Sequence, residues 1–525
     1  MTRVDPVTVE VVKNALVYAS EEMGIAMRNS AYSPNIKERL DHSCALFDAR
    51  GRLIAQAEHI PVHLGSLPWG LRQTLALIDR EYGGMREGEM WVANDPYITG
   101  THLNDVTAIR PIFFAGRLIG YAANKAHHTD VGGSVAGSMP VDAADLFAEG
   151  LVIPPMPLLN GDEPVATTIA LVCANSRTPG ARAGDLRAQI AGNHTGERRF
   201  IELCDRYGFN VVERALDRIL DDSETRMRNA LRSLGDGIFE SVDFMEDRSG
   251  EPSIRIALRL ELRDGGVRLD YEGTSPQVRF PLNAVFGVTL SGVHYALRAV
   301  TDPTIPMNDG CFRPVDVFVP EGTLLNPQRP APVSGGNVET STRNADVVLQ
   351  ALAQAAPQRV PACSGGTMSN VMLGGVRRDG RAWAFYETNG CGMGARPNSD
   401  GIDGIQCHMT NTSNTPIEAI ERDYPLRVTR YEFASGTGGA GRYRGGNGLI
   451  RAVELLEGSA QATLLADRHT LRPPGAQGGE PGACGRHALF HAGKETAEPA
   501  KVTLKLEPGD VLTVQTPGGG GFGKR

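Results

Sequence analysis

The sequence, 525 residues long, lacks the features that mark several large classes of protein. Its eight cysteines form no CxxC pair and no closely spaced set, which excludes a disulfide framework and predicts reduced thiols. No apolar run is long enough to span a membrane, and the first residues contain no apolar signal core. We therefore expect a cytoplasmic protein that does not bind a membrane.

Lysine and arginine are together fewer than aspartate and glutamate. The formal net charge is −8, and lysine and arginine nowhere form a block. A nucleic-acid-binding protein needs a basic patch or stripe to neutralise phosphates. The composition therefore argues against a nucleic acid as the partner.

The sequence contains no convincing nucleotide-binding motif, although two segments partly match such motifs. Gly436–Gly441 matches GxGxxG, but the sequence RYRGGNG that follows does not predict the helix whose N-terminus would face a pyrophosphate. Gly518–Lys524 has the spacing of a phosphate loop, but Arg525 stands where serine or threonine would hold magnesium. We predict no nucleotide-binding site in this chain.

A covalent nucleophile is not evident either. The GxSxG elbow of serine hydrolases does not occur. Cys363 and Cys391 lie in glycine-rich stretches where a thiolate would be accessible, but no histidine partner can be assigned to either. We interpret both as buried structural thiols.

Glycine, by contrast, is abundant, with 62 residues, many of them in stretches such as SGGNVETS, SGTGGAGRYRGGNG and TPGGGGFG. Such stretches are typical of shaped loops between short strands. The chain is also too long for one hydrophobic core. We predict an α+β protein rich in mixed and antiparallel sheet, with an α+β domain over residues 1–240 and a β-rich α+β domain with glycine-rich loops over residues 241–525.

Hydrophobic periodicity predicts the elements of the first domain. A helix begins after Asp5-Pro6 and ends between residues 29 and 33, and a second helix closes at Gly83-Gly84. Two hairpins turn at residues 48–51 and at Ala115-Gly116. If both hairpins share one sheet, the ends of their strands meet at one rim.

Further elements are predicted beyond residue 190. Helical patterns cover residues 196–236, 287–300 and 343–356, and alternating strands flank a turn at Asp264-Gly265. The last hundred residues read mainly as short strands.

Histidine and aspartate gather in three short stretches of the N-terminal quarter. They are KERLDHS, with Asp41; GTHLNDV, with His102 and Asp105; and AHHTD, with His127. Six of the twelve histidines precede residue 130, about twice the share that an even spread gives. Imidazole and carboxylate together suit zinc, manganese or iron better than calcium or magnesium. We predict a divalent transition-metal site in the first domain, manganese or zinc before iron, with these four residues as ligands.

Neighbouring residues are candidates for the chemistry around such an ion. His128 and Asp130 follow His127 closely, and we assign them to proton transfer or ligand orientation. His59 and His63, in AEHIPVHLGS, either contact a substrate or pack at the start of a helix. Of these two, His63 is the substrate-binding candidate.

Stretches from one end of the chain to the other resemble the hydantoinase B/oxoprolinase family, in the expected order. They include SPNIKERLDHSCALFDARGRLIAQAEHIPVHLGS, NDPYITGTHLNDV, AHHTDVGGSVAGSMP, GGNVETSTR, HMTNTSNTPIEAIE and TPGGGGFG. The resemblance implies the B-type (β-type) subunit of an ATP-dependent cyclic-amide hydrolase, which opens hydantoin, N-methylhydantoin, 5-oxoproline or lactam rings. The family's metal ligands carry over to Asp41, His102, Asp105 and His127. ACSGGTMSN and STRNADVVLQAL match no single substrate subgroup, which leaves the substrate open.

The family also implies a hetero-oligomer in which two subunits carry out different steps. A separate A-type subunit, with an actin/hexokinase-like site for ATP and magnesium, phosphorylates the amide oxygen of a small cyclic amide. The metal of the B-type chain then activates the water that attacks this intermediate. Other family members are subunits of ATP-dependent ketone carboxylases acting on acetone or acetophenone. That function is an alternative, as are a non-catalytic scaffold subunit and an ATP-independent metallohydrolase that works alone.

Overall fold

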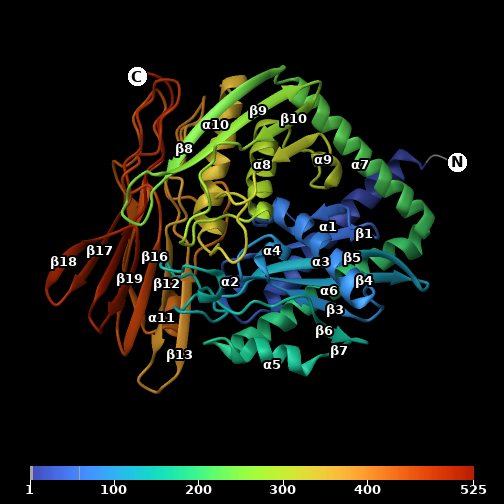
Figure 1. Cartoon of the computed structure of the whole chain (residues 1–525), viewed down its shortest axis with the longest axis horizontal. Helices are drawn as coiled ribbons and strands as arrows, with labels where there is room; N and C mark the ends of the chain where they lie inside the picture. The colour runs from blue at the N-terminus through green and yellow to red at the C-terminus, as the bar shows by residue number, and fades with distance from the viewer. Residues whose placement is uncertain (1–3, 58) are drawn as a thin grey trace.

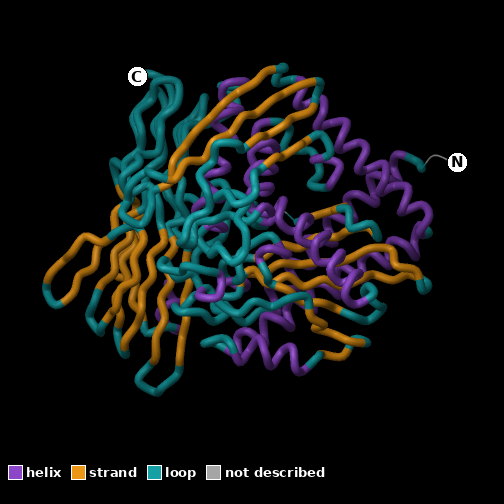
Figure 2. The backbone as a smooth tube through the Cα atoms, in the orientation of Figure 1, coloured by secondary structure: helices purple, strands orange, loops and turns teal. Residues whose placement is uncertain are grey.

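The structure, a computed structural model, describes residues 4–57 and 59–525. These residues are 31% helix and 27% strand, in four mostly antiparallel sheets, which confirms the predicted α+β class. Figure 1 shows the N-terminal elements on the right and the C-terminal strands on the left. Figure 2 shows most of the helices in the upper and right-hand parts of the molecule and at its bottom, whereas the left-hand part consists mainly of strands and loops.

The first sheet has seven strands in the order β2-β1-β5-β4-β3-β6-β7. Its strands are β1 (His42–Asp48), β2 (Leu53–Gln56), β3 (Met90–Ala93), β4 (Asp105–Phe114), β5 (Arg117–His127), β6 (Met156–Asn160) and β7 (Glu163–Pro164). Both predicted hairpins form, and β1 pairs with β5, so the two hairpins share one sheet. The second hairpin turns at Ala115 and Gly116, both at positive φ.

Helices cover both faces of this sheet, because successive side chains of a strand point to opposite sides. Leu46 of β1 packs with α1 (Pro6–Ser30), α6 (Pro179–Tyr207) and α7 (Phe209–Arg232), whereas its neighbour Phe47 packs with α3 (His63–Tyr82). The predicted first helix matches α1, which Asp5 caps, and α3 ends at Gly83 as predicted. The remaining helical segments of this half are α2 (Pro34–Lys37), α4 (Pro96–Thr99), η1 (Leu146–Ala148) and α5 (Ala166–Ala174).

A second sheet, in the order β11-β10-β9-β8, lies at the top of Figure 1. Its strands are β8 (Gly237–Met245), β9 (Ile254–Arg263), β10 (Gly266–Asp270) and β11 (Val315–Phe318). The predicted turn at Asp264 and Gly265 joins β9 to β10. The predicted helices form as α8 (Phe286–Val300) and α10 (Ser341–Ala355), with the short helix α9 (Asp309–Phe312) and the π-helical segment η2 (Gly336–Thr340) nearby.

The C-terminal strands form a sandwich of two sheets. One sheet has the order β13-β12-β16-β19 and the other β14-β15-β20-β17-β18. The strands are β12 (Asn370–Val376), β13 (Ala382–Glu387), β14 (Leu426–Ala434), β15 (Gly448–Leu455), β16 (Ser459–Leu465), β17 (Arg486–His491), β18 (Lys494–Glu498), β19 (Lys501–Leu506) and β20 (Val511–Gln515), with α11 (Ile417–Asp423) before β14. Leucine side chains from both sheets and aromatic side chains from β13 share one core, and the strands are short, as predicted.

The largest hydrophobic core joins the two halves of the chain. It contains Leu103 from the first half together with Leu297 and Met372 from the second. The predicted boundary at residue 240 falls inside β8, and the division into two domains stays a prediction.

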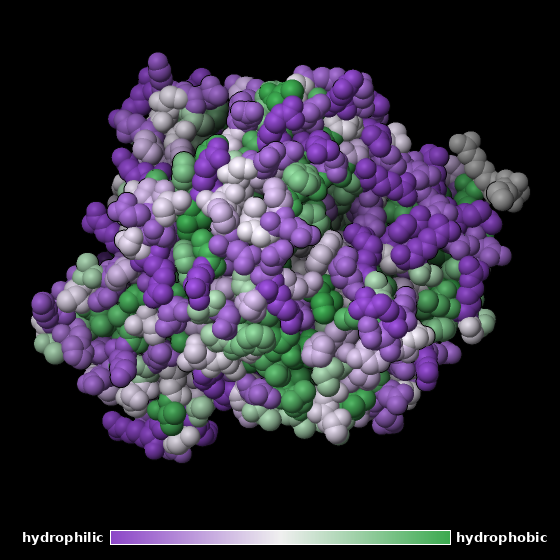
Figure 3. All heavy atoms as spheres, in the orientation of Figure 1, coloured by the Kyte–Doolittle hydropathy of each residue, from purple (hydrophilic) through white to green (hydrophobic). Residues whose placement is uncertain are grey.

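Among residues 4–57 and 59–525, none of the helices combines the length and the apolar character that crossing a bilayer requires. Figure 3 shows hydrophilic side chains dominating the right-hand part of this face, where α1 and α7 lie in Figure 1.

Candidate metal centre

Three of the predicted ligands meet at one rim of the first sheet. Asp105 begins β4 and lies directly opposite His127, which ends β5. The backbone N–H of His127 also donates to the carbonyl of Asp41, just before β1, over 3.0 Å. His102 and Asp105 lie at the two ends of a backbone turn. The Asp105 N–H donates to the His102 carbonyl across this turn over 3.1 Å. The shared sheet thus places these side chains as the two predicted hairpins require.

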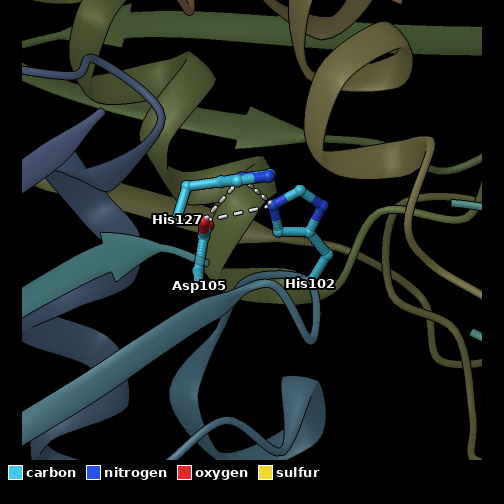
Figure 4. A group of neighbouring side chains, drawn as sticks. All are labelled: His102, Asp105 and His127. Atoms are coloured by element: carbon cyan, nitrogen blue, oxygen red, sulfur yellow. Dashed lines mark hydrogen bonds and ion pairs between the residues drawn. The ribbon is translucent and has the colours of Figure 1, made fainter. Parts of the chain in front are cut away.

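The side chains of His102, Asp105 and His127 point toward one another (Figure 4). His102 Nε2 lies 3.1 Å from Asp105 Oδ1 and 3.2 Å from His127 Nδ1. His127 Nδ1 lies 3.4 Å from the same Asp105 oxygen. All three residues are buried, so a nearly equilateral triangle of donor atoms is shielded from solvent.

This triangle fits a divalent transition metal. Ligand atoms about 2.0–2.2 Å from a tetrahedral ion lie roughly 3.3–3.6 Å from one another, which is close to the three observed separations. Two imidazoles and one carboxylate are the donor set that zinc, manganese or iron accepts. The second nitrogen of His127, Nε2, is buried and has no hydrogen-bond partner among the described residues.

The electrostatics of the triangle favour a carboxylate beside imidazoles. Burial opposes ionisation of Asp105, but His102 and the hydrogen bonds from His102, His127 and His63 hold the pKa of the carboxyl well below its usual range. Burial lowers the pKa of His127. The pKa of His102 is raised, because Asp105 outweighs the effect of burial. Asp105 is therefore ionised and can balance the charge of a cation.

The loop that carries His102 is fixed by buried polar contacts. Lys125 of β5 donates from Nζ to the Thr99 carbonyl over 2.8 Å and to Thr101 Oγ1 over 2.7 Å. Burial lowers the pKa of this lysine to about 7. Asn104 is tied to the end of β5, since its carbonyl accepts from the His128 N–H over 2.7 Å and its Nδ2 donates back to the His128 carbonyl over 3.0 Å.

Asp41 lies at the margin of the triangle. Its Oδ2 is 3.9 Å from His127 Nδ1 and 3.9 Å from Nη1 of Arg39. Arg39 is fully buried, and its guanidinium lies over the ring of Tyr386, 4.7 Å from the centroid. Arg39 therefore holds Asp41 and Tyr386 on the same side of the candidate site.

A glycine-rich turn from the second half of the chain contacts two of the candidate ligands. The Ser334 carbonyl lies 3.2 Å from His102 Nδ1, and Asn337 Nδ2 donates to Asp105 Oδ2 over 3.4 Å. Gly336, between them, has no room for a side chain, because a Cβ there would come within 1.9 Å of the Asn283 carbonyl oxygen. Glu149 fixes the segment by accepting the Ser334 N–H over 2.8 Å.

His63 lies beside the triangle, at the start of α3. Its Nε2 is 3.3 Å from Asp105 Oδ2, and its Nδ1 is 2.9 Å from Ser43 Oγ. It lines a pocket with an empty volume of about 300 Å³, which Asp41, Asp105 and His127 also line. His63 thus faces this pocket together with three of the candidate ligands.

His128 and Asp130 lie away from the triangle. His128 follows His127, so its ring turns to the other face of the sheet, where Nε2 is 3.0 Å from Gln189 Oε1 of α6. Burial lowers its pKa to about 3. Asp130 is paired with Arg177 over 2.9 Å and accepts the Gly137 N–H. Both contacts tie loops together.

His59, the other uncertain histidine, lies near Glu21, with its Nε2 3.3 Å from Oε2. Several residues that surround the triangle were not predicted as site residues. Arg39 stands beside Asp41 in KERLDHS, and Asn337 stands in GGNVETSTR, but neither stretch indicates a contact with the candidate ligands. The position of Tyr386 depends on the packing of the two halves, so no local pattern predicts it.

Comparison with known proteins places the whole chain in one group. The model of the family described as hydantoinase B/oxoprolinase matches residues 5–525. The chain is 46% identical to an uncharacterized protein of Methanocaldococcus jannaschii, over 99% of this chain and 91% of that protein. It is 32% identical to the putative B-type subunit of a D-/L-hydantoinase from a Pseudomonas strain, over 100% of this chain and 90% of that protein.

Longer relatives and solved structures are similar as well. The chain is 35% identical to 5-oxoprolinase 1 of Arabidopsis thaliana, over 99% of this chain but only 42% of that protein. The ATP-dependent caprolactamase of Pseudomonas jessenii superposes with a TM-score of 0.92 and is 31% identical, covering 100% of this chain and 92% of that one. An acetone carboxylase structure has the same fold, with a TM-score of 0.91 at 20% identity, over 99% of this chain and 76% of that one. The chain belongs to the hydantoinase B/oxoprolinase family.

Proposed function

We propose that this chain is the B-type component of an ATP-dependent cyclic-amide hydrolase. The observation that carries the proposal is the convergence of His102, Asp105 and His127 beside a pocket lined by buried residues. Relatives named as a 5-oxoprolinase, as a B-type hydantoinase component and as a caprolactamase support the reaction class. We propose further that ATP and magnesium are bound by a separate A-type subunit, as the name of the hydantoinase component suggests.

The proposed metal ligands are His102, Asp105 and His127, with Asp41 as the fourth. A divalent cation held there would polarise a carbonyl and lower the pKa of water toward neutrality. Arg39 and Asn337 would keep Asp41 and Asp105 in position through the contacts described above. The donor set indicates a class of cation, namely zinc, manganese or iron, and does not select one of the three.

His63 is better placed than His128 to move a proton. His63 lines the pocket and contacts Asp105, whereas His128 is bonded to α6 on the far face of the sheet. Ser43 Oγ, 2.9 Å from His63 Nδ1, would fix the ring and its tautomer. His63 would therefore accept a proton from water, or return one to the leaving nitrogen, from Nε2.

The pocket also offers the contacts that a cyclic amide needs. Thr388, Thr410 and Thr412 supply hydroxyl groups on one side, and Val338 and Met409 supply apolar walls. The hydroxyls would bind the polar edge of the ring, and the walls would pack against its methylene groups. Because the residues that line it are all buried, the pocket would shield a reactive phosphorylated amide from bulk water.

The decisive experiment combines this chain with its A-type partner, ATP and one of three substrates, namely 5-oxoproline, hydantoin or caprolactam. We expect ring opening and ADP release only with both subunits and ATP. Ring opening by this chain alone without ATP would instead establish a metallohydrolase that works independently. Carboxylation of acetone in the presence of bicarbonate would establish a ketone carboxylase, and a chain that binds no metal would establish a scaffold subunit.

A further inference from the structure

A surface groove, separate from the pocket beside the candidate ligands, runs between the two halves of the chain. One wall comes from the residues between α1 and α2 and from the start of α6, and the other from β13 and α11. None of the four candidate metal ligands lines it. The groove is open to solvent and has a volume of about 450 Å³, which lies within the range of small-molecule sites.

The start of α6 faces this groove with unused N–H groups. The helix is 29 residues long, and Thr178 and Ala181 of its first turn line the groove. Pro179 has no N–H, and no side chain among the described residues caps this end, so the N–H groups of Gly180 and Ala181 are free to donate. An added Cβ at Gly180 would meet no atom within 4 Å. The N-terminus of so long a helix, open in this way, attracts an anion.

Two buried side chains that line the groove carry donors without acceptors. Arg182 is fully buried; its Nη2 donates to Asp185 Oδ2 over 2.8 Å, but its Nε and Nη1 have no hydrogen-bond partner among the described residues. Asp185 is shared, because its Oδ1 accepts the Ser33 N–H over 3.0 Å. Trp383 is 4% exposed, and its Nε1 also lacks a partner there. Buried donors are normally satisfied, so this region has positive character that the chain itself does not balance.

Three more arginines stand on the opposite wall. Arg377 and Arg381 flank the turn between β12 and β13, and Arg422 lies in α11. The side chains of Arg381 and Arg422 are 76% and 72% exposed and pair with Asp379 and Asp423, respectively. Such exposed pairs contribute little, so both guanidinium groups are free to turn to an anion in the groove.

The number and arrangement of the donors favour a phosphate group. The lining contains four arginines and a single carboxylate, that of Asp423, so a ligand with more than one negative charge would be balanced. Helix N–H groups on one wall and guanidinium groups on the other need acceptor oxygens that point in several directions. The tetrahedral oxygens of phosphate provide them, and guanidinium binds two such oxygens at once.

We propose that this groove binds a phosphate group, either as inorganic phosphate or as part of a phosphate ester. Its oxygens would accept from the N–H groups of Gly180 and Ala181 and from the arginines of the opposite wall. Arg182 would supply buried positive charge beside them. This site is independent of the proposed hydrolase reaction.

The test is isothermal titration of the full chain, at constant ionic strength, with inorganic phosphate, adenosine monophosphate and adenosine. We expect saturable binding of phosphate or of the monophosphate in the millimolar range or tighter, and binding of adenosine at least about tenfold weaker. Tighter binding of the monophosphate than of phosphate would identify an ester as the ligand, and the reverse order would identify the free anion. Absence of saturable binding by both anions would overturn the proposal.

Two matched variants locate the site. Ala181→Glu places a negative charge in the groove, whereas Ala183→Glu adds the same charge to the same helix at a position that does not line it. We expect Ala181→Glu to weaken phosphate binding at least about tenfold, because like charges repel at short range, and Ala183→Glu to weaken it much less. Thermal unfolding confirms that both variants fold. Undiminished binding by Ala181→Glu would place the anion elsewhere, the candidate metal included, and refute the site.

A second pair tests the opposite wall. Arg381→Gln removes a guanidinium group of the groove, and Arg198→Gln removes one from α6 whose side chain is 63% exposed and lies outside the groove. We expect Arg381→Gln to weaken phosphate binding about threefold to tenfold and Arg198→Gln to leave it unchanged. Equal losses in the two variants would mean that phosphate senses only the overall charge of the protein, which would also overturn the proposal.

Discussion

The ring of Tyr386 lies almost parallel to the imidazole of His127, with centroids 4.6 Å apart and an angle of 15° between the planes. Tyr386 belongs to β13 in the C-terminal sandwich, and His127 ends β5 in the first sheet. The hydroxyl of Tyr386 donates to Asn370 Oδ1 over 2.9 Å, which holds the ring in place. A residue of the second half of the chain thus restrains the orientation of a candidate ligand from the first half.

Replacing Tyr386 separates the stacked ring from its hydroxyl. Tyr386→Phe should keep metal content unchanged and lower the free energy of unfolding by about 1 kcal/mol, the usual value of one hydrogen bond. Tyr386→Ala should lower it by about 3–5 kcal/mol, because a cavity opens beside His127, and should weaken metal binding. Metal analysis with urea unfolding measures both effects. Equal metal affinity in the two variants would show that the stacked ring does not restrain His127.

Asp105 and Asp130 are two buried carboxylates of the same half with different surroundings. Asp105→Asn should purify with little or no transition metal but remain folded, since an asparagine can still bond to the neighbouring imidazoles. Asp130→Asn should keep its metal and lose about 1–3 kcal/mol of stability, because the Arg177 pair is weakened. Elemental analysis and circular dichroism distinguish the two outcomes. A full complement of metal in Asp105→Asn would disprove the ligand assignment.

The adjacent pair His127 and His128 offers a sharper comparison. His127→Gln should lose both metal and turnover, whereas His128→Gln should retain both, because His128 contacts Gln189 on the opposite face of the sheet. The measurements are metal content and the rate of ring opening by the two-subunit complex. If His128→Gln abolished turnover while keeping metal and stability, the assignment of His128 to proton transfer would stand.

Acid should destabilise the protein through histidines that are buried in neutral form. Burial lowers the pKa values of His294 and His487 to about 3, whereas in the unfolded chain they return to about 6.5. The unfolded chain therefore binds more protons below about pH 6.5. Each group should reduce the free energy of unfolding by up to about 1.4 kcal/mol per pH unit, until the pH approaches the folded-state value.

Urea unfolding between pH 7.5 and 5.5 measures this dependence. His294→Gln should flatten it, because one titrating group is removed. The matched control is His194→Gln, since the His194 side chain is 40% exposed, and it should leave the slope as it is. A slope that His294→Gln does not change would mean that other groups govern the acid sensitivity.

Much of the first sheet could be predicted from local patterns. Alternating strands and turn residues located both hairpins, and Ala115-Gly116 has the positive φ that such a turn needs. The pairing of β1 with β5 follows from no local signal, yet it brings Asp41 close to His127. The start of α6 at Pro179, well before residue 196, escaped prediction because its N-terminal half is interrupted by small and polar residues.

Local sequence patterns also predict only part of the candidate site. The spacing of His102 and Asp105, and the place of His127 at the end of a strand, predict that these candidate ligands lie close together, and the structure brings them together. Proximity in sequence does not bring His128 to the triangle, because the chain leaves β5 at His127 and the next side chain contacts Gln189 of α6. The contact of Asn337 with Asp105 depends on a π-helical turn from the other half of the chain, and such long-range packing leaves no periodic trace in the sequence.

The pocket beside the triangle is lined from both ends of the chain, by Asp41 and His63 on one side and by Tyr386, Thr388 and Thr412 on the other. A fragment that stopped before β12 would keep every candidate ligand and yet leave them open to bulk solvent. If the proposed reaction takes place here, an activated substrate in such a fragment would meet bulk water before it could react. The C-terminal sandwich thus encloses the pocket and supplies none of the candidate ligands. A protein shortened to the half that carries the candidate ligands would lose this enclosure.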